Sequence, residues 1–202
     1  IGAFGPQRRV DWAASIGHDR PMNNVSIITL NGHTPQIHPS AFIAPGCRII
    51  GDVDIGPEAS IWYNCVLRGD VNAIRIGARS NIQDGTGIHC DSDKGGMPGT
   101  KTIIEEGALI GHMAMLHGCT VRKNALVGLG SIVMDGCVLE ENSMLAAGGM
   151  LTPGKRIESF QMWGGRPAKL MRELDEMWAT GNSLAVAHYV HNAKTHKAAI
   201  NG

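Results

Sequence analysis

The stretch "IHPSAFIAPGCRIIGDVDIGPEASIWYNCVL", residues 37–67, has an aliphatic residue at every sixth position. The same spacing returns in later blocks, separated by insertions and by one contraction of a single residue. The aliphatic positions are Ile37, Ile43, Ile49, Ile55, Ile61, Leu67, Ile76, Ile82, Ile88, Ile104, Ile110, Leu116, Val121, Val127, Val133, Leu139, Leu145, Leu151 and Ile157. A small or compact residue stands four positions after most of them. Helices and simple strands have other periods, whereas a six-residue repeat is typical of a parallel β-helix.

Each repeat predicts one flat face, and three repeats predict one triangular coil of 18 residues. The aliphatic residues should point into the prism, and the small residues should stand at its corners. Cys47, Cys65 and Cys137 occupy small positions and are expected to be buried there. The predicted fold class is therefore mainly β, a parallel β-helix over residues 25–160. Residues 161–202 carry apolar side chains at helical spacing and predict α-helices packed outside the prism, with a break near Gly181.

Residues 1–24 share no pattern with the rest and are predicted to be an N-terminal extension, non-native or disordered. A mitochondrial presequence is disfavoured by Asp11 and Asp19. The formal net charge is zero, which gives no support for a nucleic-acid or anionic-membrane partner. No apolar run is long enough for a membrane span. Five cysteines without a pairing pattern favour a reduced, cytoplasmic location.

The largest break in the repeat is a ten-residue insertion, "DSDKGGMPGT" at 91–100. Without it, Leu116 would follow Ile88 by 18 residues, which is one full coil. His89 and His117 each follow one of these aliphatic residues directly, so they should stand on the same face, one rung apart. Rungs are separated by about 4.8 Å, so two outward imidazoles could share one metal ion. Two solvated histidines are the structural alternative.

His112 follows Ile110 by two positions and belongs to the preceding face. A single chain is therefore not expected to bring it to the other two histidines. A neighbouring prism could contribute its own His112, and three prisms would then share three sites by cyclic symmetry. Cys90 and Cys119 lie close to the candidate histidines, but zinc sites that mix cysteine and histidine usually show tighter cysteine spacing. His188 and His191 share one helix face and are predicted to be solvated or lightly packed.

Several motifs resemble the gamma-class carbonic anhydrases over residues 30–175. They are "RGD" at 68–70, "RSNIQDG" at 79–85, "IH" at 88–89 and "IGHMAMLHGC" at 110–119. The resemblance implies a left-handed β-helix, a homotrimer and a metal site between subunits. It implies His89 and His117 as ligands from one chain and His112 from its neighbour.

The resemblance also implies roles for five further residues. Gln83 would orient water at the metal, with Asp84 as its companion and Asn81 on the same strand. Arg68 and Asp70 would bridge subunits near the bicarbonate site, and a purely structural ion pair is the alternative for them. Asn81 and Gln83 alternate, so both should project to one side of their strand.

The implied activity is the reversible hydration of carbon dioxide to bicarbonate by a lyase, with metal-bound hydroxide as the nucleophile. Three neutral imidazoles leave one coordination position open, which is typical of a catalytic zinc site. Zinc is expected, and iron or cobalt also suits imidazole ligands. The chain departs from the best-studied members at two acidic proton-shuttle positions, where it carries Val71 and Ser92. Asp91 and Asp93 lie beside the second position.

Two alternatives stay open. The chain could be a metal-binding relative with little carbon dioxide hydration, acting as a thioesterase or as a subunit in an assembly. It could also be a hexapeptide acyltransferase, which uses a single histidine as a base. Dependence on acyl-CoA and loss of activity on chelation would separate these hypotheses.

Overall fold

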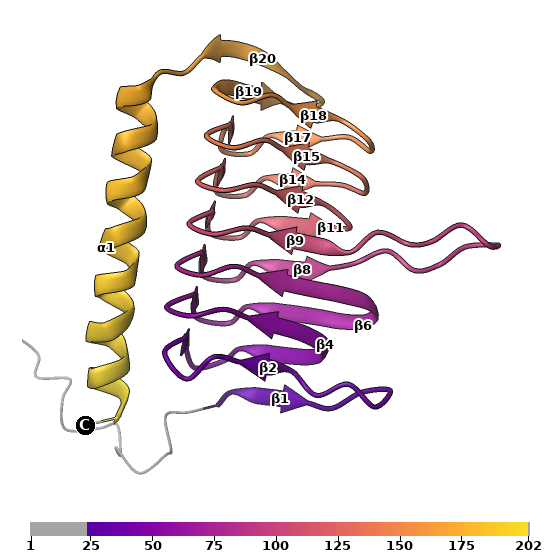
Figure 1. Cartoon of the computed structure of the whole chain (residues 1–202), viewed down its shortest axis with the longest axis vertical. Coiled ribbons are helices and arrows are strands. Elements are labelled where there is room, and N and C mark those ends of the chain that lie inside the picture. The colour runs from indigo at the N-terminus through magenta and orange to yellow at the C-terminus, as the bar shows by residue number, and fades with distance from the viewer. Residues whose placement is uncertain (1–23, 202) are drawn as a thin grey trace, which may run out of the picture.

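Short parallel strands stacked in rungs build a three-sided prism, and one long helix stands beside it (Figure 1). The computed structural model describes residues 24–201. The predicted N-terminal extension therefore lies outside the described residues, except for Asn24. The predicted parallel β-helix is confirmed, and its three faces are named face 1, face 2 and face 3 below.

Two strands are long enough to turn an edge and serve two faces: β4 (Arg48–Ile55) and β6 (Val66–Ile76). Face 1 consists of β1 (Ser26–Ile28), the first parts of β4 and β6, β8 (Gly87–His89), β11 (Met115–His117), β14 (Ile132–Val133) and β17 (Met150–Leu151). Face 2 consists of β2 (Gln36–Ile37), the last parts of β4 and β6, β9 (Thr102–Ile104), β12 (Thr120–Val121), β15 (Val138–Leu139) and β18 (Arg156–Ile157). Face 3 consists of β3 (Phe42–Ile43), β5 (Ser60–Ile61), β7 (Asn81–Ile82), β10 (Leu109–Ile110), β13 (Leu126–Val127), β16 (Met144–Leu145), β19 (Gln161–Gly165) and β20 (Ala168–Glu173).

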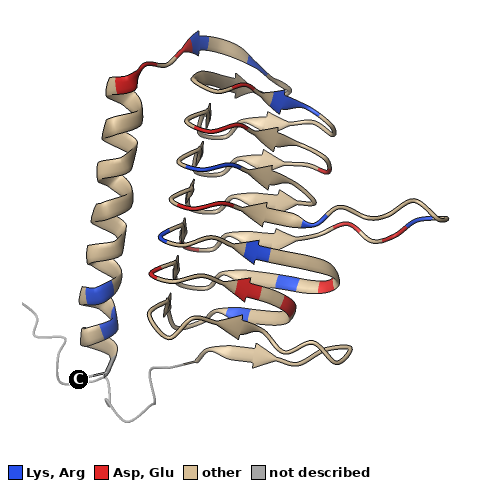
Figure 2. Cartoon of the chain, in the orientation of Figure 1, with Lys and Arg blue, Asp and Glu red and all other residues tan. Residues whose placement is uncertain are grey.

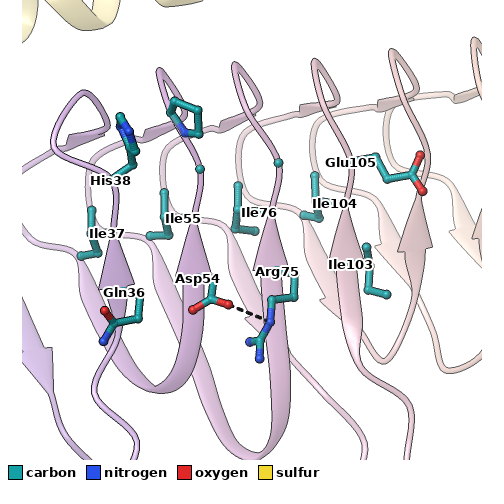
Figure 3. Close-up of a pocket in the computed structure, with 13 residues that line it drawn as sticks. Gln36, Ile37, His38, Asp54, Ile55, Arg75, Ile76, Ile103, Ile104 and Glu105 are labelled. Carbon is teal, nitrogen blue, oxygen red and sulfur yellow. Dashed lines mark ion pairs between the residues drawn. The ribbon is translucent and has the colours of Figure 1, made fainter.

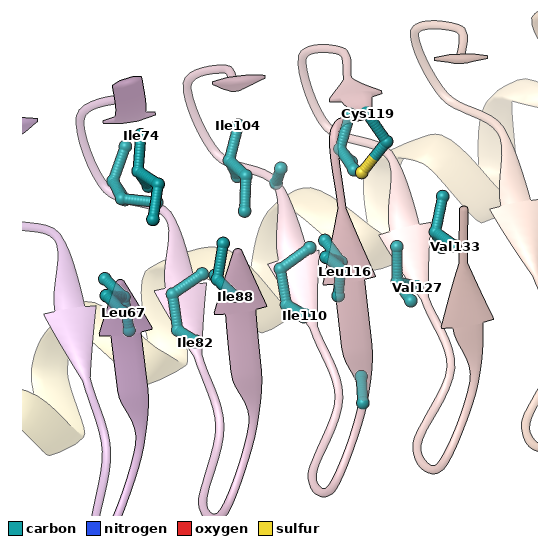
Figure 4. Close-up of a cluster of buried hydrophobic side chains, with 14 of the residues drawn as sticks. Leu67, Ile74, Ile82, Ile88, Ile104, Ile110, Leu116, Cys119, Val127 and Val133 are labelled. Atoms are coloured by element: carbon teal, nitrogen blue, oxygen red, sulfur yellow. The ribbon is translucent and has the colours of Figure 1, made fainter. Parts of the chain in front are cut away.

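The core is the column of aliphatic side chains that the repeat predicts (Figure 4). From Ile49 to Ile157 every predicted aliphatic position is buried, while Ile37 and Ile43 on the first rungs are partly exposed. Burying one such side chain contributes about 1.5–3 kcal/mol, and the repetition extends this contribution along the whole axis. Cys47, Cys65 and Cys137 are buried at the corners, as expected.

The corners need residues that tolerate a left-handed backbone. Asn64 has φ 60° at the edge between face 3 and face 1, and Gly46 has φ 86° one rung below. A Cβ on Gly46 would lie only 2.0 Å from Asn64 Oδ1, so this corner requires glycine.

The predicted helix over residues 161–173 is wrong. Strand β19 pairs with β16 in parallel, and Trp163 stands opposite Leu145 as the next member of the inward column. The repeat thus continues one strand beyond Ile157, but with an aromatic residue that an aliphatic pattern does not detect. The chain then reverses at Gly165, with φ 92°, and β20 pairs with β19 in antiparallel orientation.

A single helix, α1 (Glu176–Asn201), follows this hairpin, and the predicted break near Gly181 is also wrong. Asp175 caps the helix, because its Oδ1 accepts a bond from the Trp178 N–H at 2.8 Å. Asn182 continues the helix and points inward, where its side chain donates to the carbonyl oxygen of Asn124 at 2.9 Å. This residue therefore attaches the helix to the prism and does not end it.

Helix α1 packs on face 3, as the prediction of an outer helix requires (Figure 1). At the middle of the helix, Tyr189 contacts Trp62 edge-to-face at 5.7 Å, and Trp62 contacts Phe42 in the same way at 5.5 Å. Charged residues are rare on the helix and frequent on face 2 (Figure 2). Within residues 24–201 no helix is long and apolar enough to cross a membrane.

Candidate metal centre

The edge between face 1 and face 2 carries the chain's longest excursion. The insertion after β8 forms a projecting loop between β8 and β9 (Figure 1). His89 ends β8 and His117 ends β11, and the two residues are register partners on neighbouring rungs. The insertion therefore lies outside the coil and leaves the 18-residue register intact, as the sequence predicts.

The two imidazoles face each other. The Nδ1 atom of His89 lies 3.0 Å from the Nε2 atom of His117, and the ring centroids are 4.9 Å apart. Both side chains are partly buried, with their rings directed away from the prism interior.

A carboxylate contacts the other nitrogen of each ring. Asp70 Oδ1 accepts from His89 Nε2 at 2.7 Å, and Asp135 Oδ1 accepts from His117 Nδ1. In neutral imidazoles these bonds leave His89 Nδ1 and His117 Nε2 without protons. Two bare nitrogens at this distance repel each other unless a cation lies between them. Two ligands on one metal at about 2.0–2.1 Å have a similar spacing, so the donor set fits a divalent transition metal.

Asp70 has a second partner in Arg68, on the same strand β6. Burial acts to raise the pKa of Asp70, but the hydrogen bonds from His89 and Arg68 outweigh it and hold the pKa below its usual value. The carboxylate is therefore ionised at neutral pH and can accept the imidazole proton.

His112 lies at the opposite edge of face 1, where face 3 meets it. Its Nδ1 bonds to Asp84 Oδ2 at 2.8 Å, on the neighbouring rung. Among the described residues, no group of three or more His, Cys, Asp or Glu side chains could hold a metal ion. This agrees with the expectation that one chain does not bring His112 to the other two histidines.

Asn81 and Gln83 project together from β7 and the turn that follows it. Gln83 Nε2 donates to Asn81 Oδ1 at 2.9 Å, and both side chains are buried. Asn81 Nδ2 has no hydrogen-bond partner among residues 24–201. Gln83 also lines a cavity of about 210 Å³ whose other walls are apolar, formed by Leu109, Gly111, Leu126, Val127, Gly128, Leu129, Met144 and Ala147. His112 directly follows Gly111, so this cavity adjoins the His112 edge.

Val71 and Ser92, which stand where the best-studied members carry acidic proton shuttles, lie near the edge between face 1 and face 2, where His89 stands. Val71 is exposed, and the Ser92 N–H donates to Asp91 Oδ1 at 3.0 Å. Asp91 also pairs with Lys94 at 2.8 Å, and this contact lowers the pKa of the Asp91 carboxyl. Asp93 accepts a bond from the Gly99 N–H at 2.7 Å. Both loop aspartates thus have partners within the loop.

Sequence reasoning missed Asp135. Asp135 follows His117 by 18 residues, but the one-residue contraction makes the coil from β11 to β14 17 residues long, so the repeat brings Met134 and not Asp135 into register with His117. Reasoning from the histidines alone does not ask which side chain reaches their outer nitrogens.

The remaining candidates lie elsewhere. All five cysteines are free and buried, and Cys119 belongs to the aliphatic core. His188 bonds to Asn192 at 2.9 Å on α1, and His191 is exposed. An open groove of about 580 Å³ runs along face 2, where Asp54 pairs with Arg75 (Figure 3). None of the predicted site residues lines this groove.

Comparison with known proteins supports the resemblance. A family model described as "Bacterial transferase hexapeptide (six repeats)" matches residues 34–69. The chain is 42% identical over 163 residues to "Gamma carbonic anhydrase 2, mitochondrial" of Arabidopsis thaliana, which covers 81% of this chain and 59% of that protein. It is 48% identical over 150 residues to "Carbonic anhydrase" of Geobacillus kaustophilus, with 74% and 79% covered.

Among solved structures, a hexapeptide transferase family protein from Anaplasma phagocytophilum matches with a TM-score of 0.78 and 44% identity, covering 84% of this chain and 97% of that one. The chain spans about three fifths of the length of the Arabidopsis protein. With 48% identity over 79% of the Geobacillus protein, and the named gamma relatives beside it, the chain belongs to the gamma-class carbonic anhydrase family.

Proposed function

We propose that this protein catalyses the metal-dependent, reversible hydration of carbon dioxide to bicarbonate. One observation carries the proposal. His89 Nδ1 and His117 Nε2 face each other across 3.0 Å, and a carboxylate contacts the other nitrogen of each ring. Carboxylates that accept the outer N–H of the ring in this way are the usual partners of metal-bound histidines.

The ligand set requires a second subunit. His89 and His117 of one chain would hold the ion with His112 of the partner subunit. Zinc suits three imidazoles best, and iron or cobalt also suits them. When bound, the cation supplies Lewis-acid activation of water near neutral pH.

Face 1 is the surface best suited to this association. Helix α1 covers part of face 3, and ion pairs such as Arg75–Asp54 and Arg122–Glu105 occupy face 2 and its corner. Face 1 instead exposes Val66 and Met115, 41% and 49% accessible. Both histidine edges border this face. A cyclic homotrimer would bring the His112 edge of each chain to the His89 edge of the next.

The chain's own residues can bind and orient the reactants. Gln83 lines the cavity that adjoins His112, where its amide can hold a water or a substrate oxygen by a hydrogen bond. Asn81 fixes that amide through its bond to Nε2. Arg68 lies next to the His89 ligand through Asp70, and its guanidinium can attract the bicarbonate anion.

A second activity at the same site has one observation in its favour. The apolar cavity of about 210 Å³ beside Gln83 has several times the room that a three-atom substrate needs. Hydrolysis of a small acyl thioester would use that room for the acyl chain. A hexapeptide acyltransferase is the third hypothesis. Its support is that the matching family model and the Anaplasma protein are both described as hexapeptide transferases.

The test is stopped-flow carbon dioxide hydration by the zinc-loaded protein, beside His117→Ala and the matched control His191→Ala on the exposed side of α1. We expect a rate above buffer that chelation removes, that His117→Ala lacks and that His191→Ala retains. No rate at full metal occupancy would overturn the proposal, and thioester hydrolysis would then be assayed. Activity that depends on acyl-CoA and survives chelation would favour the acyltransferase.

We also propose a cytoplasmic location for this protein. The five free thiols support a reduced compartment.

A further inference from the structure

We propose that Asp135 is a positioning residue that fixes the tautomer and orientation of His117 for metal binding. The inference rests on the metal site proposed above and adds a residue that neither the repeat nor the resemblance indicates. The Asp135 carboxylate accepts the Nδ1 proton of His117, which leaves Nε2 bare and facing His89 Nδ1.

The backbone holds Asp135 firmly in this place. Asp135 follows β14, the rung next to β11, and its neighbour Gly136 donates its N–H to the Gly118 carbonyl at 2.7 Å. Gly118 is the residue directly after His117. The turn that carries the carboxylate is therefore tied to the turn that carries the histidine.

Gly118 also makes room for the carboxylate. Its φ is 51°, and a Cβ on this residue would lie 2.5 Å from Asp135 Oδ1. Any other residue at position 118 would push the carboxylate away from the imidazole. The small residue and the acid one rung above thus form one unit.

Among residues 24–201, Asp135 forms an ion pair with His117 and with no lysine or arginine, although its side chain is 38% accessible. Water can reach this carboxylate, yet within residues 24–201 its side-chain hydrogen bond is to the imidazole of His117.

The other two candidate ligands have the same arrangement. Asp70 contacts His89 and Asp84 contacts His112, so Asp135 completes a set in which every imidazole has its own carboxylate. Such partners fix which ring nitrogen faces the metal, and their loss typically weakens metal binding about 10–100-fold.

The test is zinc affinity, measured by competition with a chromophoric chelator on the metal-free protein. We expect Asp135→Ala to weaken zinc binding by about 10–100-fold. Asp135→Asn should lose less, because its amide oxygen still accepts the Nδ1 proton. Glu140→Gln removes another partly buried carboxylate near face 2 and should leave the affinity unchanged.

A second readout is the histidine tautomer, observed by ¹⁵N NMR of the imidazole rings. In the wild type His117 should carry its proton on Nδ1, and in Asp135→Ala the two tautomers should mix. If Asp135→Ala does not fold, the near-isosteric Asp135→Leu, which also lacks an acceptor for the Nδ1 proton, decides by the same measurements.

The outcomes separate the two proposals. If the wild type binds zinc and Asp135→Ala has the same zinc affinity and the same His117 tautomer, the role of Asp135 is overturned and the metal site stands. A wild-type protein that binds no zinc would overturn both. Zinc binding without carbon dioxide hydration would overturn only the proposed activity.

Discussion

His89 Nδ1 and His117 Nε2 lie 3.0 Å apart although 27 residues separate the two histidines in the chain. The parallel register of β8 and β11 pairs them directly, because the loop at 91–100 leaves the prism and returns to the same coil. His112 stands at the other edge of face 1, bonded to Asp84. One chain therefore presents two separate parts of the proposed site.

This separation predicts complementation between two inactive variants. His112→Ala and His117→Ala homotrimers should each lack zinc at all three sites. When the two proteins are unfolded, mixed in equal amounts and refolded, every mixed trimer regains one complete site, so about one quarter of the sites should bind zinc. Zinc content after gel filtration measures the recovery.

The matched control mixes His89→Ala with His117→Ala. These substitutions remove ligands from the same half of the site, so no mixture can restore it. Zinc in this control, or none in the His112→Ala mixture, would contradict a site shared between subunits.

The sequence predicted the prism because one inward position repeats every six residues, a period that is typical of a parallel β-helix and that neither a helix nor a simple strand has. Leaving out the ten-residue insertion at 91–100 places His89 and His117 one coil apart in the sequence, so the pairing of these two histidines was also predictable. The C-terminal hairpin was not, because Trp163 takes an inward position that the aliphatic pattern assigns to Ile, Leu or Val. Asn182 likewise suggested a helix end, and only the contact with Asn124 explains it.

Asp135 was out of reach for a different reason. Its role depends on the direction of a side chain at a corner, where the alternation of a strand no longer holds. The contact appears only when the Gly118 turn and the Asp135 turn are stacked in three dimensions.

Face 1 should fail to associate when a charge is placed at its centre. Met115 points outward on β11, between the two histidine edges, and three glutamates around a cyclic interface would repel one another and lose their hydration. We expect Met115→Glu to sediment as a monomer of about 21.5 kDa at micromolar concentration and to bind zinc poorly.

Met177→Glu is the control, since Met177 on α1 is 80% accessible and should stay so in the trimer. An intact Met115→Glu trimer would mean that the subunits associate through another surface.

Arg75 should stabilise the protein in a pH-dependent way. It pairs with Asp52 Oδ1 at 2.7 Å and with Asp54 Oδ2 at 2.9 Å on face 2 (Figure 3 shows the second pair). The Arg75 contact lowers the pKa of Asp52. Stability from this pair is therefore present above the unfolded carboxyl pKa of about 3.9 and is lost as the pH falls through the lower folded value.

Arg75→Met should lower the free energy of unfolding by about 1 kcal/mol or less at pH 7, because the pair is partly exposed. The difference should shrink as the pH falls through the folded pKa of Asp52 and approach zero below it. Urea unfolding at a fixed protein concentration measures both values. An equal loss at both pH values would assign the effect to the packing of the arginine stem.

Proton release should limit turnover, because Val71 and Ser92 replace the acidic carriers of the best-studied members. Asp91 lies beside Ser92, but Lys94 lowers the pKa of its carboxyl, and a group that titrates far below neutral pH transfers protons poorly there. We expect the rate of carbon dioxide hydration to rise with buffer concentration, since the buffer must remove the proton. Ser92→Glu should raise the rate at low buffer concentration by about tenfold or more and weaken the dependence on buffer.

Met97→Glu adds the same charge at the exposed part of the same loop and controls for a general electrostatic effect. Equal rates for the two variants would mean that proton transfer at position 92 does not limit the reaction, and the proton would then have to leave by a route that does not pass the 91–100 loop.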